Sequence, residues 1–152
     1  MMDYSKLINS IHMLDEDTDP KWGRMNSSMM LKHCSAFIDV YLNKTKLNPL
    51  IFIVGFVFGI FHRLYLKYIV RYNVKNYIKN LPTLKVFNTY RCKNLDFEFE
   101  KNKLINDLKE VESIKNKYLF NNFHGVVPNK AFKKVVYFHT SYHLYQFGVY
   151  GD

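Results

Sequence analysis

Apolar residues recur at spacings of three and four along four stretches of the chain, which is the periodicity of amphipathic helices. The predicted helices cover residues 5–14, 26–42, 97–118 and 130–147. The candidate N-caps are Ser5, then one of Asn26, Ser27 and Ser28, and finally Asp96. Gly148 is placed to follow the last helix, and 121–128 is expected to be a turn-rich loop. The pattern predicts an all-α fold, with 1–152 as a single domain built on a four-helix bundle.

One stretch is apolar on every side rather than on one face. The residues of 50–61, LIFIVGFVFGIF, would span about 18 Å as a helix, against about 30 Å of bilayer hydrocarbon. Gly55 and Gly59 form a G-x-x-x-G pair, which permits close helix contact. We interpret this stretch as a buried helix or as a contact between subunits of a homodimer. Docking on a membrane surface is the less favoured alternative.

The net charge of +9 is concentrated in the middle of the chain, which raises the question of an anionic partner. Residues 40–95 contain ten basic and no acidic side chains. A predicted helix over 62–79 would carry a basic stripe of Arg63, Lys67, Arg71, Lys75 and Lys79. The stripe suits either an anion-facing surface or a solvated helix face. The solvated face is favoured, because no nucleic-acid-binding motif accompanies the stripe, and nucleic acid is not an expected partner.

The two cysteines provide no disulfide framework, and Cys34 is expected to be a small buried apolar side chain. The N-terminal residues lack the basic and apolar regions of a signal peptide. We therefore expect a cytoplasmic protein with a reducing environment.

Histidines supply the candidate chemistry. His139 and His143 stand four residues apart in the last predicted helix, so their rings project from one face and can hold one divalent ion. The glutamate of a metalloprotease H-E-x-x-H motif is absent, because residue 140 is Thr. His33 is the candidate third ligand, since it lies on the apolar face of its helix. The alternative is that these are ordinary, partly buried histidines.

The remaining histidines are less informative. His12 and His62 have no partner at a useful spacing, so we expect neither to be functional. His124, in the turn-rich loop near a glycine, is a weaker candidate for a pocket residue.

Several motifs resemble those of one known group of proteins. They are YFHTSYHLYQFG (137–148), PKWGRMNSSMMLKHC (20–34), KNLPT (79–83) and DFEFEKNKL (96–104). Their order and spacing are similar to those of a subfamily of unknown function in the DinB/YfiT-like superfamily of metalloenzymes. The C-terminal signature of that subfamily reads roughly H-x-x-H-H-x-x-Q-F-G. The resemblance covers nearly the whole chain.

The resemblance implies a DinB-like four-helix bundle with an apolar and basic helical insertion between its second and third main helices. It also implies three histidine ligands for a divalent metal, which on this sequence are His33, His139 and His143. Zinc and nickel are the first expectations, followed by manganese and iron. Gln146 matches the signature and is a candidate to orient a group at the metal, and Tyr142 replaces one histidine of the doubled pair.

The loop before the last helix also departs from the subfamily. Residues 124–132 lack its usual Phe-Gly and Trp, with Phe132 near the Trp position. The substrate pocket is therefore expected to differ.

Taken together, the sequence predicts a metal-dependent enzyme of unknown substrate, with an open position for water or a thiol. Thiol transfer with a small thiol cosubstrate and hydrolysis are the expected reactions on a small molecule. Two alternatives remain open: a non-catalytic metal-binding or interaction protein, and an anion or membrane-surface binder acting through residues 50–79.

Overall fold

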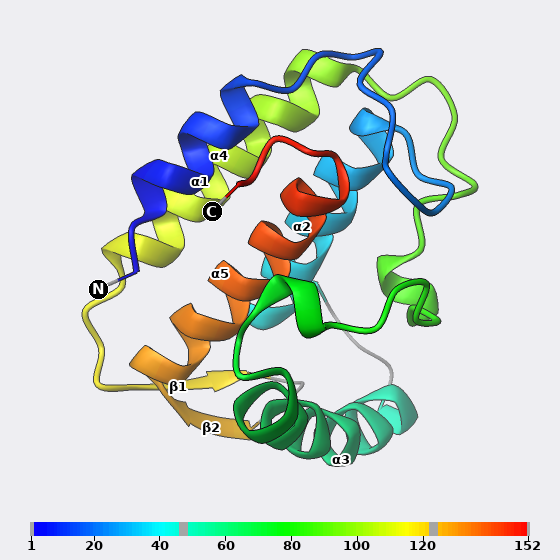
Figure 1. Ribbon diagram of the computed structural model, residues 1–152. Coiled ribbons are helices and arrows are strands. Elements are labelled where there is room, and N and C mark those ends of the chain that lie inside the picture. Colours follow the sequence, from blue (N-terminus) through cyan, green and yellow to red (C-terminus); the bar gives the residue numbers. More distant parts are fainter. Residues whose placement is uncertain (1, 46–48, 122–124, 152) are drawn as a thin grey trace.

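The computed structural model describes residues 2–45, 49–121 and 125–151 (Figure 1). Within these ranges the chain forms five α-helices and one two-stranded hairpin. The helices are α1 (Tyr4–His12), α2 (Ser27–Tyr41), α3 (Pro49–Tyr65), α4 (Phe97–Ser113) and α5 (Asn129–Gln146). The strands are β1 (Tyr118–Asn121) and β2 (Gly125–Pro128). Three single turns, η1 (Leu66–Val70), η2 (Val74–Asn76) and η3 (Lys85–Phe87), lie in the connection between α3 and α4.

Four of the helices share one hydrophobic core. Helix α2 packs against α4 and α5, and α1 packs against the same two helices. The core contains Leu7, Ile11, Met30, Leu31, Ile38, Leu104, Leu108, Val111, Val136 and Leu144, all fully buried. The expectation of a mainly helical protein is therefore confirmed. The hairpin is an addition that the all-α prediction missed.

Polar side chains begin three of these helices. Asn26 accepts a hydrogen bond from the Met29 amide at the start of α2, as expected for one of its candidate caps. Asp96 does the same for Phe99 in α4. In α1 the cap is Asp3 rather than Ser5, because the Asp3 carboxylate accepts from the Ser5 amide and the helix begins one residue before Ser5.

The end of α4 corrects the predicted helix over 97–118. The helix stops at Ser113, and Ile114 has an extended backbone. The following strands pair antiparallel, with Phe120 opposite Val126. Aromatic and β-branched residues favour a pleated strand, and these propensities outweigh the helical spacing that precedes them.

Helix α3 corrects the prediction that 50–61 is buried. The helix does form, but Ile53, Val57 and Phe61 are exposed. In Figure 1, α3 crosses one end of the molecule, and it packs mainly against the turn that follows it. None of the helices in the described part of the chain has the length and apolarity to cross a membrane.

The basic stripe does not lie on one helix. Arg63 belongs to α3 and Lys67 to the π-helical turn η1, but the regular helix ends before Lys75. The helix is interrupted at Arg71 and Tyr72, which both have left-handed backbone conformations, with φ of 56° and 54°. The later members of the stripe therefore lie in an irregular connection that runs across the face of α2 and α5 (Figure 1).

Candidate metal centre

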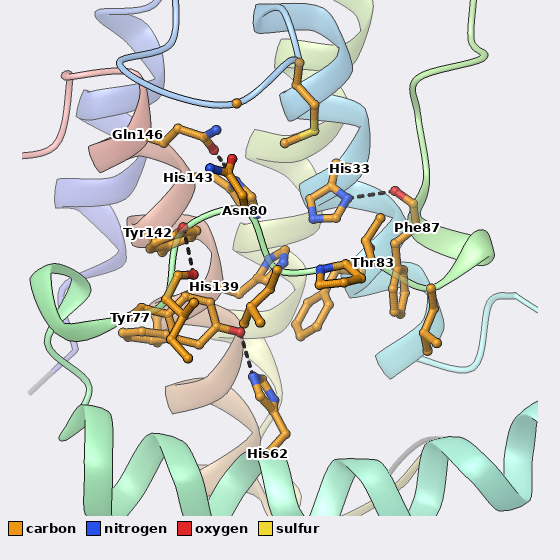
Figure 2. Close-up of a pocket in the computed structure, with 18 of the residues that line it drawn as sticks. His33, His62, Tyr77, Asn80, Thr83, Phe87, His139, Tyr142, His143 and Gln146 are labelled. Atoms are coloured by element: carbon orange, nitrogen blue, oxygen red, sulfur yellow. Dashed lines mark hydrogen bonds between the residues drawn. The ribbon is translucent and has the colours of Figure 1, made fainter.

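Three histidines from two helices meet between α2 and α5. His33 lies in α2, and His139 and His143 are one turn apart in α5 (Figure 2). The rings are close to one another, with centroid distances of 5.1 Å from His33 to His139, 4.7 Å from His33 to His143 and 4.8 Å between the last two. One ligand atom from each residue lies within 4.8 Å of the other two. The three candidate ligands thus form one cluster.

A main-chain oxygen fixes the orientation of His33. Its Nδ1 lies 2.7 Å from the carbonyl oxygen of Phe87 in η3. Because a carbonyl only accepts, Nδ1 must carry the proton, and Nε2 keeps its lone pair. Nε2 is therefore the nitrogen of His33 that is available to a metal ion.

The side-chain amide of Gln146 fixes the orientation of the His143 ring. The Nε2 of Gln146 donates to the carbonyl oxygen of Trp22 at 2.6 Å, which sets the direction of the amide. Its Oε1 then faces the Nδ1 of His143 at 2.9 Å and accepts a hydrogen bond. Nε2 of His143 is left with a free lone pair. Gln146 thus contacts a candidate ligand directly and links it to the main chain.

A glycine makes this contact to the Trp22 carbonyl possible. Gly23 has a φ of +94°, and a Cβ at this position would lie 2.6 Å from Nε2 of Gln146. Any other residue would be strained in this conformation and would collide with the amide. The Trp-Gly pair of the N-terminal motif therefore has a structural role at the centre.

His139 differs from the other two rings. It stacks on Phe37 with a centroid distance of 3.9 Å and an interplanar angle of 9°. Its buried Nδ1 has no hydrogen-bond partner among the described residues. A buried ring nitrogen without a partner is unfavourable, and one ring nitrogen of His139 lies within 4.8 Å of a ring nitrogen of each of the other two histidines. The residues present therefore fit a metal ion.

All three imidazoles are held in the neutral form. Burial lowers the pKa of His143 to about 3, with a further contribution from His33. Burial also lowers the pKa of His33. The pKa of His139 lies well below its ordinary value because of burial and the neighbouring His143 and His33. Neutral imidazole is the form that binds transition metals, so no deprotonation is required near neutral pH.

The histidine cluster lines a cavity of about 460 Å³. Most of the lining is aromatic or aliphatic, including Trp22, Phe37, Leu66, Tyr77, Phe87 and Phe138. Among the described residues, those that line it include no aspartate or glutamate. The cavity is lined by α2, α3, α5, the loop between α1 and α2, and the connection between α3 and α4. It can take a small, largely apolar molecule beside the three histidines.

The structure also brings a second polar pair to the cavity. The Nε2 of His62, in α3, lies 3.0 Å from the hydroxyl of Tyr77 (Figure 2). Burial lowers the pKa of His62 to about 4 and raises that of Tyr77. Spacing along the chain offered His62 no partner, whereas the fold supplies one in Tyr77. The two residues are 15 positions apart, and no spacing rule within a helix would have paired them.

The other sequence candidates lie around or away from this cavity. Tyr142 is buried beside His143, with ring centroids 5.2 Å apart, and its hydroxyl donates to the Ile78 carbonyl at 3.3 Å. Phe132, near the subfamily's Trp position, is buried in the core instead. Cys34 is buried against Met30 and has a raised pKa, which confirms its role as a small apolar side chain.

Of the remaining histidines, His12 is exposed at the end of α1. His124 lies outside the described residues.

No protein-family model matches this chain, and neither the curated proteins nor the solved structures contain a match. The fold and the histidine cluster therefore stand on their own geometry. They define a mainly helical protein with a buried group of three histidines that could hold a metal ion.

Proposed function

We propose that this protein is a divalent-metal-dependent enzyme in which His33, His139 and His143 hold the metal beside a small, apolar substrate. The observation that carries the proposal is the position of the cluster. The three ring systems line a cavity large enough for a small molecule, and the cluster found among the described residues contains only these three ligands. A catalytic site needs such an open side, whereas a structural site is closed by protein ligands.

The ligand set determines which chemistry is supplied. Three neutral imidazoles contribute no charge, so a bound zinc or nickel ion would keep its full double charge and lower the pKa of a water molecule or a thiol. Thiol transfer and hydrolysis both use such an activated nucleophile. An apolar cavity suits the transfer of a small thiol to an apolar electrophile, and this is the reaction we favour.

We assign proton transfer to His62 and Tyr77, because the part of the cavity lining that the structure describes offers no carboxylate. The neutral imidazole of His62 can accept a proton, and the Tyr77 hydroxyl hydrogen-bonded to it can pass one on. Gln146 keeps the His143 ring turned toward the cluster through the bond to its Nδ1. We further propose that the packing of α1, α2, α4 and α5 is the four-helix bundle of the DinB/YfiT-like superfamily.

Elemental analysis of protein purified without a histidine tag tests the proposal first. The matched set is wild type, His33→Ala, the double variant His139→Ala/His143→Ala, and His12→Ala as the exposed control. We expect about one equivalent of a transition metal in wild type and in the control, and none in the two cluster variants. Failure of wild type to take up zinc or nickel after dialysis would overturn the metal site.

A second measurement separates catalysis from simple metal storage. The metal-loaded protein is tested with a panel of small thiols and electrophiles, and with ester and amide substrates, beside His62→Gln. We expect turnover that requires the metal and falls at least about tenfold in His62→Gln, because one proton acceptor is lost. Metal binding without turnover on any of these substrates would favour the non-catalytic alternative.

The Gln146 contact gives a prediction about affinity. Replacing Gln146 by Leu keeps the volume but leaves the Nδ1 of His143 and the Trp22 carbonyl without their partner. We expect the dissociation constant for zinc to rise by about 10- to 100-fold, measured by competition with a chromogenic chelator. Gln146→Glu keeps the acceptor for His143 and should bind zinc more tightly than Gln146→Leu. Equal affinity in wild type and Gln146→Leu would contradict this role.

A further inference from the structure

One face of α3 exposes large apolar side chains to solvent. Ile53 is 61% exposed, Val57 51%, Phe61 67% and Leu64 47%. Their spacings of four, four and three place them on a single stripe along the helix. Isolated apolar residues on a surface are ordinary, but a continuous apolar stripe marks a surface that contacts another protein or a membrane.

The stripe extends beyond the end of α3. In the π-helical turn η1, Tyr68 is 59% exposed and Ile69 is 67% exposed, while Leu66 is fully buried. Gly59 is buried on the opposite side of α3. The helix therefore has one side turned to the protein and one apolar side turned to solvent.

Positive charge borders this apolar surface. Lys67 is exposed one turn beyond the stripe, with its Nζ 4.7 Å from the centre of the Tyr68 ring, whereas Arg63 is half-buried and lies toward Tyr41 and Tyr72. Over residues 40–95 the sequence has ten basic side chains and no acidic one. An apolar face with basic and aromatic residues at its border is the pattern of helices that lie in a membrane interface.

The hairpin adds a second apolar surface at the same end of the molecule (Figure 1). Tyr118, Phe120 and Val126 are 54%, 57% and 68% exposed. Phe120 and Val126 are cross-strand partners, and Tyr118 points to the same face of its strand as Phe120. The Nζ of Lys117 lies 5.6 Å from the Tyr118 ring centre. This end of the protein thus combines apolar side chains with lysines in two separate elements.

We propose that the exposed face of α3 docks on a membrane surface that contains anionic lipids. The apolar stripe would enter the boundary between head groups and acyl chains, and the exposed Lys67 would meet the lipid phosphates. The charge decides against a second copy of the chain as the occupant. Two such faces in a symmetric dimer would bring basic residues together without an acidic residue from 40–95 to balance them.

Vesicle flotation with the full-length protein tests the proposal. One set of vesicles contains phosphatidylcholine only, and the other contains one third phosphatidylglycerol. We expect binding to the anionic vesicles to exceed binding to the neutral ones by about tenfold or more, and to fall sharply at about 0.5 M salt. Equal absence of binding to both sets would overturn the proposal.

Matched variants locate the surface. Phe61→Asp in α3 should weaken binding to anionic vesicles by about tenfold or more, because it removes a large apolar side chain and adds a negative charge. Phe99→Asp is the control, since Phe99 has a similar exposure of 62% but lies in α4. Lys67→Glu and the control Lys109→Glu compare the same charge change in α3 and α4. Circular dichroism establishes that each variant is folded.

Sedimentation of the same proteins without lipid completes the test. We expect the oligomeric state to be the same in wild type and Phe61→Asp. If wild type were a dimer, Phe61→Asp a monomer and neither bound vesicles, the surface would be a subunit interface and the proposal would be wrong. Loss of vesicle binding in Phe99→Asp to the same degree as in Phe61→Asp would also overturn it.

Discussion

The structure revises the interpretation of His62 more than that of any other candidate residue. It lines the cavity, half-buried, and its ring shares a hydrogen bond with the Tyr77 hydroxyl. Burial lowers its pKa from 6.5 to about 4, so the folded protein holds it neutral at a pH where the unfolded chain is already protonated. Such a group links folding stability to pH.

We expect the metal-free protein to lose stability as the pH falls from about 6.5 to about 4. The free energy of unfolding falls with falling pH because the pKa of His62 is lower in the folded state, so the unfolded state binds more protons over this range. His62→Gln removes one such group, so its loss of stability between about pH 7 and about pH 5 should be smaller than that of wild type. Urea unfolding at the two pH values measures the difference.

His12→Gln is the control for this experiment, because His12 is exposed. Its stability should follow the same pH dependence as wild type. A pH dependence in His62→Gln that is identical to wild type would show that the pKa of His62 is the same in the folded and unfolded states.

The sequence predicted the three histidines but not what surrounds them. His139 and His143 are four residues apart, and local helix geometry is enough to bring them together. His33 required only that the apolar faces of α2 and α5 pack against each other. The carbonyl groups of Trp22 and Phe87 could not be predicted, because every residue has a carbonyl and only the tertiary fold selects one.

At the scale of elements, helix boundaries followed local signals where these were strong. The Asn26 and Asp96 caps were predicted, since a short polar side chain before an apolar periodicity is a local feature. The hairpin and the break after η1 were missed. Arg71 and Tyr72 adopt left-handed conformations that nothing in their own chemistry favours, so the packing of the connection must impose them.

The Asp96 cap yields a prediction for α4. The Asp96 Oδ1 accepts from the Phe99 amide at 2.9 Å, and Asp96→Ala leaves that amide without its partner. We expect the free energy of unfolding to fall by about 1 kcal/mol, measured by urea denaturation. Asp96→Asn keeps an acceptor of the same size and should lose much less. Equal losses in the two variants would mean that the charge, and not the hydrogen bond, stabilises the helix.

At the scale of the whole molecule, ion pairs join α2 to α4 along the edge of the core. Lys32 of α2 lies 2.9 Å from the buried carboxylate of Glu100 in α4. Lys103 of α4 lies 2.9 Å from Asp39 of α2 and 2.7 Å from Asp107 of its own helix. These contacts keep α2, which carries His33, in register with the helix that supports it.

We expect Lys103→Met to destabilise the protein by about 1–2 kcal/mol. The Asp107 side chain is only 8% exposed, and the change removes its closest cation. The expected loss of stability is small because Lys103 is itself one-third exposed and water screens the ion pair. Thermal unfolding of Lys103→Met and the exposed control Lys109→Met provides the comparison. Identical melting temperatures would show that the ion pair contributes nothing.

At the centre, Trp22 and Phe87 each have two separate roles, one for the backbone carbonyl and one for the side chain. Trp22 and Phe87 hold the histidine and glutamine groups with their backbones, while their side chains line the cavity. Substitution of either side chain leaves a carbonyl in place. Under the proposed function, the substrate range is therefore open to change at these two positions by laboratory evolution while both carbonyl contacts to the cluster are kept, which makes them the first positions to randomise.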